Sequence, residues 1–166
     1  MRYVGRYATT QAKLRSYLAR KLRERGWDGE REPDLDALAR RFSELGYVDD
    51  AAYALAKSQA LTGRGYGKRR LADKLRIAGV GDEDAAGARD HADAHALDAA
   101  IRFAQRRRIG PFAAATAAAD PRQRDKAIAA MVRAGHSFDL ARAIAGLGPG
   151  AEVDLDALRQ QARIDP

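Results

Sequence analysis

A glycine-rich loop is the first pattern in the chain whose residue types could do chemistry. Residues 63–68 read Gly-Arg-Gly-Tyr-Gly-Lys, and a glycine loop that ends in lysine can hold the phosphates of a nucleotide. That class of loop needs glycine at position 62 and Ser or Thr at position 69, where this chain has Thr62 and Arg69, and no buried strand precedes it. We interpret the loop, residues 62–67, instead as a flexible linker that lets Tyr66 and the basic helix after it reach a partner.

The second pattern is a pair of histidines, His91 and His95, with the spacing of two metal ligands on one helical face. Asp90 and Asp93 lie beside them. No glutamate follows His91 to act as a base and no third strong ligand is evident, so no metal site is predicted. The chain also offers no Ser-His-acid set and no spaced pair of carboxylates. We predict a protein that is not an enzyme and has no cofactor.

Positive charge is the third chemical feature, and it is unevenly distributed. The chain of 166 residues has a net charge of +7. Residues 1–80 hold 18 Lys and Arg against 10 Asp and Glu, whereas residues 81–166 hold 12 against 13. A basic half of this kind attracts polyanions, which are either nucleic acid or an acidic protein surface. A basic surface that serves solubility alone is the alternative interpretation.

The elements that position these charges repeat along the chain. Residues 18–27 and 71–80 have nearly the same sequence pattern, and residues 127–136 are a weaker copy of it. The first two copies are offset by 53 positions, and the second and third by 56. Each copy predicts an amphipathic helix whose Leu22, Leu75 or Met131 packs inward, followed by a glycine that ends it. Spacing of this length is typical of a three-helix unit that is used repeatedly.

Caps and apolar spacing predict helices throughout and no strands. Thr9 and Thr10 are candidate caps for a helix that ends at Arg25, and Lys68–Ala78 is a helix in the second copy. Further helix starts are predicted at Asp34, Asp49-Asp50, Asp82, Asp120-Pro121 and Ser137. The predicted fold is all-α, with tandem three-helix repeats forming an elongated array. Its repeats are expected at 1–46, at 47–94 and at 95–150, with a polar tail at 151–166. Whether the first repeat is complete stays open at this point.

Basic residues recur on corresponding faces of the first two repeated helices. Lys13, Arg20 and Arg23 lie away from the Leu14, Leu18 and Leu22 stripe, and the second copy follows the same rule. There Arg69, Arg70, Lys74 and Arg76 flank the Leu71 and Leu75 stripe. Solvation of an amphipathic helix explains polar residues at these positions but does not explain the recurrent positive sign.

Composition restricts the environment of the chain. It contains no cysteine, so disulfides, thiolate nucleophiles and cysteine-bound zinc are excluded. No segment approaches the roughly 18 consecutive apolar residues that a membrane span needs. We expect a cytoplasmic protein that does not enter a membrane.

The middle of the chain resembles the RecX family of bacterial recombination regulators. The resemblance rests on Leu45-Gly46-Tyr47-Val48-Asp49-Asp50-x-x-Tyr53-Ala54, on Arg64-Gly65-Tyr66-Gly67-Lys68-Arg69-Arg70-Leu71 and on Leu75-x-x-x-Gly79-Val80. The first repeated helix and the helix at 35–45 extend the likeness to about residue 80, and the third copy matches in pattern alone. The resemblance implies tandem three-helix units that form an elongated, curved array. It also implies that this array binds the RecA filament on DNA, occupies its helical groove and suppresses its ATPase and strand-exchange activities.

The residues expected to contact the RecA filament and its single-stranded DNA combine the basic helical faces with the family-like loop. They are Lys13, Arg20, Arg23, Arg64, Tyr66, Lys68, Arg69, Arg70, Lys74 and Arg76. We expect the protein to act as a monomer. Two other functions remain open at this point, namely a plain DNA-binding protein that grips phosphates without a RecA target and a helical scaffold for an acidic partner.

Overall fold

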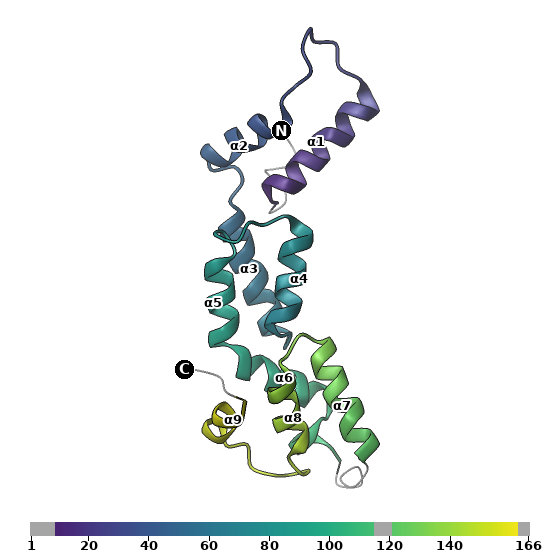
Figure 1. Cartoon of the computed structure of the whole chain (residues 1–166), viewed down its shortest axis with the longest axis vertical. Coiled ribbons are helices and arrows are strands. Elements are labelled where there is room, and N and C mark those ends of the chain that lie inside the picture. Colours follow the sequence, from purple (N-terminus) through teal and green to yellow (C-terminus); the bar gives the residue numbers. More distant parts are fainter. Residues whose placement is uncertain (1–8, 115–120, 163–166) are drawn as a thin grey trace. The chain divides into compact units, whose positions relative to one another are not determined.

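The computed structural model describes residues 9–114 and 121–162, and every regular element in those two ranges is helical (Figure 1). This confirms the all-α fold that was predicted from the sequence. The helices are α1 (Gln11–Arg25), α2 (Leu35–Glu44), α3 (Asp50–Gly63), α4 (Lys68–Ala78), α5 (Ala86–Ala94), α6 (Ala96–Arg107), the 3-10 helix η1 (Gly110–Phe112), α7 (Pro121–Arg133), α8 (Phe138–Gly146) and α9 (Leu155–Ala162).

The helix starts follow local capping chemistry. The Thr10 side chain accepts a hydrogen bond from the N–H of Lys13, and Asp34 and Ser137 cap α2 and α8 in the same way. Asp120, predicted as another start, lies outside the described residues. The start predicted at Asp82 is four residues early, because residues 82–85 form a turn before α5 begins.

The chain forms two compact units, and three of its helices contribute to both. Unit 1 comprises residues 1–56 and 74–88, and unit 2 comprises residues 57–73 and 89–166. The unit boundary therefore falls within α3, within α4 and within α5. The three-repeat division predicted from the sequence stays a prediction.

Unit 1 has a small core to which α1, α2, α3 and α4 each contribute. Its buried side chains include Leu14, Ala39, Val48, Ala54 and Leu75. Helix α1 packs against α2. The three glycines predicted to end the repeated helices all have positive φ, at 75° for Gly26, 71° for Gly79 and 98° for Gly135, which confirms their role as stop residues.

Unit 2 has the larger core, formed mainly by α6, α7 and α8. Helix α8 packs against α7, α6 and α9. The core includes Phe103, Met131, Leu140, Ile144 and Leu158, each at most 4% exposed. Of the three repeat positions predicted to pack inward, Leu75 and Met131 are buried and Leu22 is half-buried.

Candidate functional site

Four basic residues predicted from the sequence line one groove of unit 1. Lys13, Arg20 and Arg23 come from α1, and Arg76 comes from the last turn of α4. The groove has a volume of about 470 Å³. None of the described residues that line it is acidic. A cluster of like charges on a concave surface raises the local concentration of anions, so this groove can hold a polyanion.

Two buried polar side chains, one hydroxyl and one carboxyl, hold α1 against the rest of unit 1. The Thr10 hydroxyl donates a hydrogen bond of 2.6 Å to the carbonyl of Ala78 at the end of α4. The Asp50 carboxyl accepts from the N–H of Gln11 at 2.9 Å. Burial raises the pKa of Asp50, and this hydrogen bond opposes the rise. Both contacts join the start of α1 to residues far away in the sequence, so they fix the position of the basic face.

A glycine allows the close approach of α1 and α4. Gly79 has φ 71°, and a Cβ atom placed on it would overlap the side chain of Ala12. Only glycine meets both requirements, because it has no Cβ and tolerates positive φ. The glycine that ends the repeated helix in α4 therefore also shapes one wall of the groove.

The cations of the groove differ in how firmly they are held. The Lys13 ammonium donates to the hydroxyl of Tyr53 at 2.6 Å and lies 4.4 Å from the centre of that ring. Arg20 forms an exposed ion pair with Glu24 at 3.0 Å. Exposed pairs of this kind contribute about 0–1 kcal/mol, so a polyanion can displace Glu24 easily. Lys13 is held in place, and Arg20 is free to reach a ligand.

Sequence reasoning missed two groove residues that carry no charge. Tyr17 is half-buried in the groove, with the Arg20 guanidinium 5.4 Å from its ring centre. Ile77 also lines it and is 70% exposed, the largest exposure among the described large apolar side chains. Tyr17 lies four residues after Lys13 and three before Arg20, so helical spacing could have found it. No spacing in the sequence marked Ile77 as a groove residue.

The other predicted residues lie elsewhere. Lys74 is exposed on α4 within unit 1 but does not line the groove. The remaining five belong to unit 2, and they are Arg64, Tyr66, Lys68, Arg69 and Arg70. The structure thus divides the predicted contact residues between the two units and brings only Lys13, Arg20, Arg23 and Arg76 together in one groove.

Residues 62–67 do not form the flexible linker that was predicted. Gly65 and Gly67 are buried, and a Cβ atom on Gly65 would lie 2.8 Å from the backbone nitrogen of Phe103. The N–H of Gly67 donates to the carbonyl of Ala134 at 3.0 Å. The prediction was wrong because these glycines permit close backbone packing within unit 2 and do not confer freedom.

A second buried contact fixes the same loop. His136 is 2% exposed, and its Nε2 lies 3.1 Å from the carbonyl oxygen of Gly65. Burial lowers the pKa of His136, and the hydrogen bond to Gly65 opposes that shift. The neutral imidazole is therefore favoured, and it serves as a structural partner for the loop.

The packed loop presents Tyr66 between basic side chains. The guanidinium of Arg70 lies 4.5 Å from the Tyr66 ring centre, and that of Arg106 lies 5.9 Å away. Cation–π contacts of this geometry contribute about 0.5–1 kcal/mol at exposed sites. Lys68 is paired with Asp93 at 2.6 Å, which reduces the positive charge at the start of α4.

The histidine pair is packed together in unit 2. The rings of His91 and His95 stack with centroids 4.2 Å apart, and His91 Nδ1 lies 3.0 Å from the Ser58 hydroxyl oxygen. Burial, and then the neighbouring His95, lower the pKa of His91. Across the part of the chain that the structure describes, no group of three metal-ligating side chains is found.

Comparison with known proteins finds relatives that cover most of the chain. A regulatory protein RecX of Myxococcus xanthus is 34% identical over 159 residues, which are 90% of this chain and 83% of that protein. The chain belongs to the RecX family. A RecX regulatory protein of Agrobacterium fabrum is 32% identical over 79% of this chain and 71% of its own length. One of a Mycobacterium strain is 41% identical over 49% of this chain and 43% of its own length.

Membership of the RecX family confirms the resemblance found in the sequence and gives the chain a regulatory role. No protein-family model matches the chain. Helices long and apolar enough to cross a membrane are absent from the described ranges, 9–114 and 121–162.

Proposed function

We propose that this RecX family protein binds the RecA filament on DNA and inhibits its ATPase and strand-exchange activities. The observation that carries the proposal is the groove of unit 1, where Lys13, Arg20, Arg23 and Arg76 gather without an acidic neighbour in the lining. A filament of protein on DNA presents rows of phosphates. The groove supplies cations on a wall that Thr10 and Asp50 hold in place.

The charge of the groove sets the expected salt dependence. Each cation that neutralises a phosphate releases condensed counterions, which contributes about −0.7 to the slope of log K against log salt on single strands. Contacts from the four groove cations together predict a slope of about −3. The predicted residues of unit 2, such as Arg64, Arg69 and Arg70, would make the slope steeper if they bind phosphates as well.

The exposed side chain of Ile77 favours a binding target that contains protein as well as DNA. Ile77 is 70% exposed, and contact with phosphates would give this apolar side chain no favourable free energy. A protein surface that covers it would contribute about 25 cal/mol of binding free energy for each Å² of apolar surface buried. Ile77 lines the same groove as Arg23 and Arg76. A filament of RecA on DNA offers both kinds of surface.

The test compares charge reversals at two places in unit 1. Arg20→Glu with Arg23→Glu reverses two groove cations, and Arg40→Glu with Arg41→Glu makes the same charge change on α2, outside the groove. ATP hydrolysis by RecA on single-stranded DNA is measured with substoichiometric amounts of each variant. We expect the groove variant to lose inhibition by at least about tenfold in concentration and the α2 variant to keep it.

Equal inhibition by the groove variant and the wild type, with both correctly folded, would remove unit 1 as the contact surface. The predicted residues of unit 2 would then be tested by Arg69→Glu with Arg70→Glu. Loss of inhibition in the α2 variant as well would show that net charge, and not the groove, determines the effect.

A plain DNA-binding protein is the second candidate, and Tyr17 favours it. Aromatic side chains between cations stack on unpaired bases, and each stacked base contributes about 1–3 kcal/mol. Ile77→Ala separates the two functions, since it should weaken binding to RecA-coated DNA and leave binding to bare single-stranded DNA unchanged. Binding to bare DNA that RecA does not enhance would favour the second candidate.

We also propose that the protein acts as a monomer in the cytoplasm, without catalysis. A repeat protein with several basic faces can contact neighbouring filament subunits by itself, so that binding energy adds along the filament. Light scattering on the purified protein in moderate salt should give the mass of one chain. A dimer mass that persists on dilution would contradict this part of the proposal.

A further inference from the structure

Unit 2 contains a pocket that uses none of the residues assigned to the proposed filament interface. Its volume is about 390 Å³, within the range of about 300–1,000 Å³ that is typical of ligand sites. The walls come from the end of α6, the loop before η1, helix α7 and the end of α8. All of these segments belong to unit 2.

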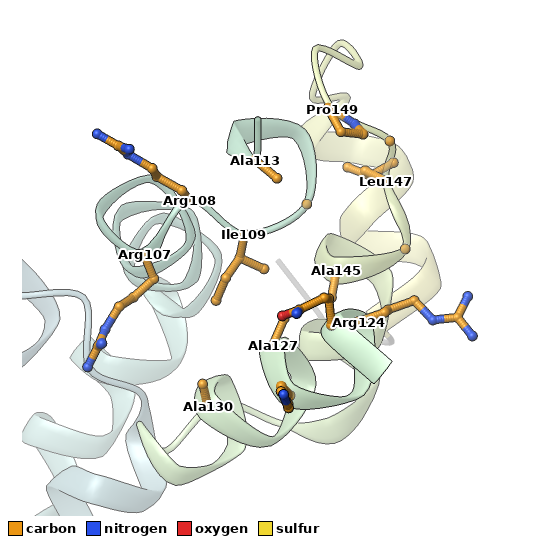
Figure 2. Close-up of a pocket in the computed structure, with 15 residues that line it drawn as sticks. Arg107, Arg108, Ile109, Ala113, Arg124, Ala127, Ala130, Ala145, Leu147 and Pro149 are labelled. Atoms are coloured by element: carbon orange, nitrogen blue, oxygen red, sulfur yellow. The ribbon is translucent and has the colours of Figure 1, made fainter. Parts of the chain in front are cut away.

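The pocket has an apolar interior and a basic rim. Ile109, which is 6% exposed, Ala127 and Ala145 lie between the arginines in the close-up view (Figure 2). Arg107 and Arg108 extend on one side of the pocket, and Arg124 extends on the other (Figure 2). Lys126 adds a fourth cation, and the described lining contains no acidic side chain.

Helix electrostatics explain only half of this charge. Arg107 lies in the last turn of α6, where the partial negative charge of the helix end favours cations. Arg124 lies near the start of α7, whose first turn has no acidic residue, and cations are unfavourable at that end of a helix. The dipole of α7 therefore does not account for the cation that Arg124 places at the rim.

The backbone at Arg108 is also unfavourable. Arg108 has φ 54°, and it is the only residue other than glycine with positive φ among the described residues. Asparagine or glycine adopts this left-handed conformation at lower cost. The chain instead places a third cation at the rim, and Gly110 packs against the carbonyl of Ile144 to hold the adjoining loop.

The side chains inside the pocket distinguish between nucleic acid and an acidic peptide as its anionic ligand. Single-stranded nucleic acid binds proteins by stacking its bases on aromatic side chains, and the described lining of this pocket has none. Aliphatic side chains at the centre with cations on both sides match a peptide that carries an apolar anchor between carboxylates. We propose that this pocket binds an acidic protein segment whose apolar side chain enters between Arg107 and Arg124. The groove of unit 1, with Tyr17, has the opposite character.

The experiment measures binding of a fluorescent peptide to the full chain by anisotropy. The peptide carries a Leu-Phe pair flanked on both sides by glutamates, and a second peptide has Ala-Ala in place of that pair. Arg107→Glu with Arg124→Glu reverses one cation on each side of the pocket. Arg102→Glu with Arg133→Glu makes the same change on the same two helices, at exposed positions outside the lining.

We expect the Leu-Phe peptide to bind, the Ala-Ala peptide to bind at least about tenfold more weakly, and the pocket variant to lose about tenfold in affinity while the control variant keeps it. A thymidine oligonucleotide of equal charge should not displace the peptide. The proposal is overturned if the peptide does not bind, if both peptides bind equally, if both variants weaken binding alike, or if the oligonucleotide displaces the peptide at equal charge. The two peptides test the wild type alone, so the comparison holds even where a variant does not fold.

Discussion

Truncation of Leu75 tests the packing of unit 1 most directly. Leu75 is 3% exposed on α4 and belongs to the part of that helix that lies in unit 1. The change Leu75→Ala deletes three buried carbon atoms, and at about 0.8 kcal/mol for each the lost transfer free energy is about 2.4 kcal/mol. The residual cavity adds to this, and buried leucines lose about 2–5 kcal/mol in total. We predict a loss of about 3 kcal/mol in the free energy of unfolding.

Ile77→Ala is the matched control, because it deletes the same number of carbon atoms from the same helix two residues later. Ile77 is 70% exposed, so its truncation should change the free energy of unfolding by less than about 0.5 kcal/mol. Urea unfolding followed by far-ultraviolet circular dichroism measures both variants. Equal losses in the two variants, or a loss below about 1 kcal/mol for Leu75→Ala, would refute the assignment of the buried face of α4.

Two glycines and one buried histidine give three further stability predictions. Gly65→Ala should lower the free energy of unfolding by about 2 kcal/mol or more in urea unfolding, because φ is 76° and the new Cβ would meet the backbone of Phe103. Gly87→Ala should raise the free energy of unfolding by about 0.5–1 kcal/mol, because a Cβ atom on Gly87 would have nothing within 4 Å. The pKa of His136 is lowered from 6.5, so below that pH the unfolded chain binds a proton that the folded chain resists. Melting temperatures should therefore fall as the pH drops below about 6.5 and level off below the folded pKa, and His136→Gln should reduce this dependence, whereas an unchanged dependence would assign it to other groups.

The sequence predicted the elements whose causes are local. Thr10, Asp34 and Ser137 accept hydrogen bonds from N–H groups three residues later, so each cap is determined within one helical turn. Apolar spacing identified Leu14 and Leu75 as buried for the same reason. Such features need no knowledge of the rest of the chain.

The loop at residues 62–67 shows where local reasoning ends. A glycine can supply freedom or can permit close packing, and the sequence around Gly65 is the same in either case. The carbonyl of Gly65 is hydrogen-bonded to the His136 side chain, which lies 71 positions away in the sequence. His136 is buried, and no pattern in the sequence linked it to this loop.

The candidate site was predicted in part for the same reason. A helical wheel placed Arg20 and Arg23 on the exposed face of α1, and both are exposed. The wheel could not show that Thr10 would bring Arg76 to the same groove, or that Tyr53 would hold Lys13 in place. These contacts join residues that lie about forty or more positions apart, so they depend on the fold and not on the spacing within a helix.

The two basic regions differ in what lies between their charges, and that difference determines what each can recognise. Cations steer any polyanion toward a surface and set its salt dependence, but they discriminate poorly between phosphates and carboxylates. The groove of unit 1 adds Tyr17 and Ile77, while the pocket of unit 2 adds aliphatic side chains around Ile109. Charge reversal alone therefore cannot identify either ligand. Substitution of the uncharged residues can, because Ile77→Ala leaves every cation of the groove in place and removes only the contact that a protein surface would make.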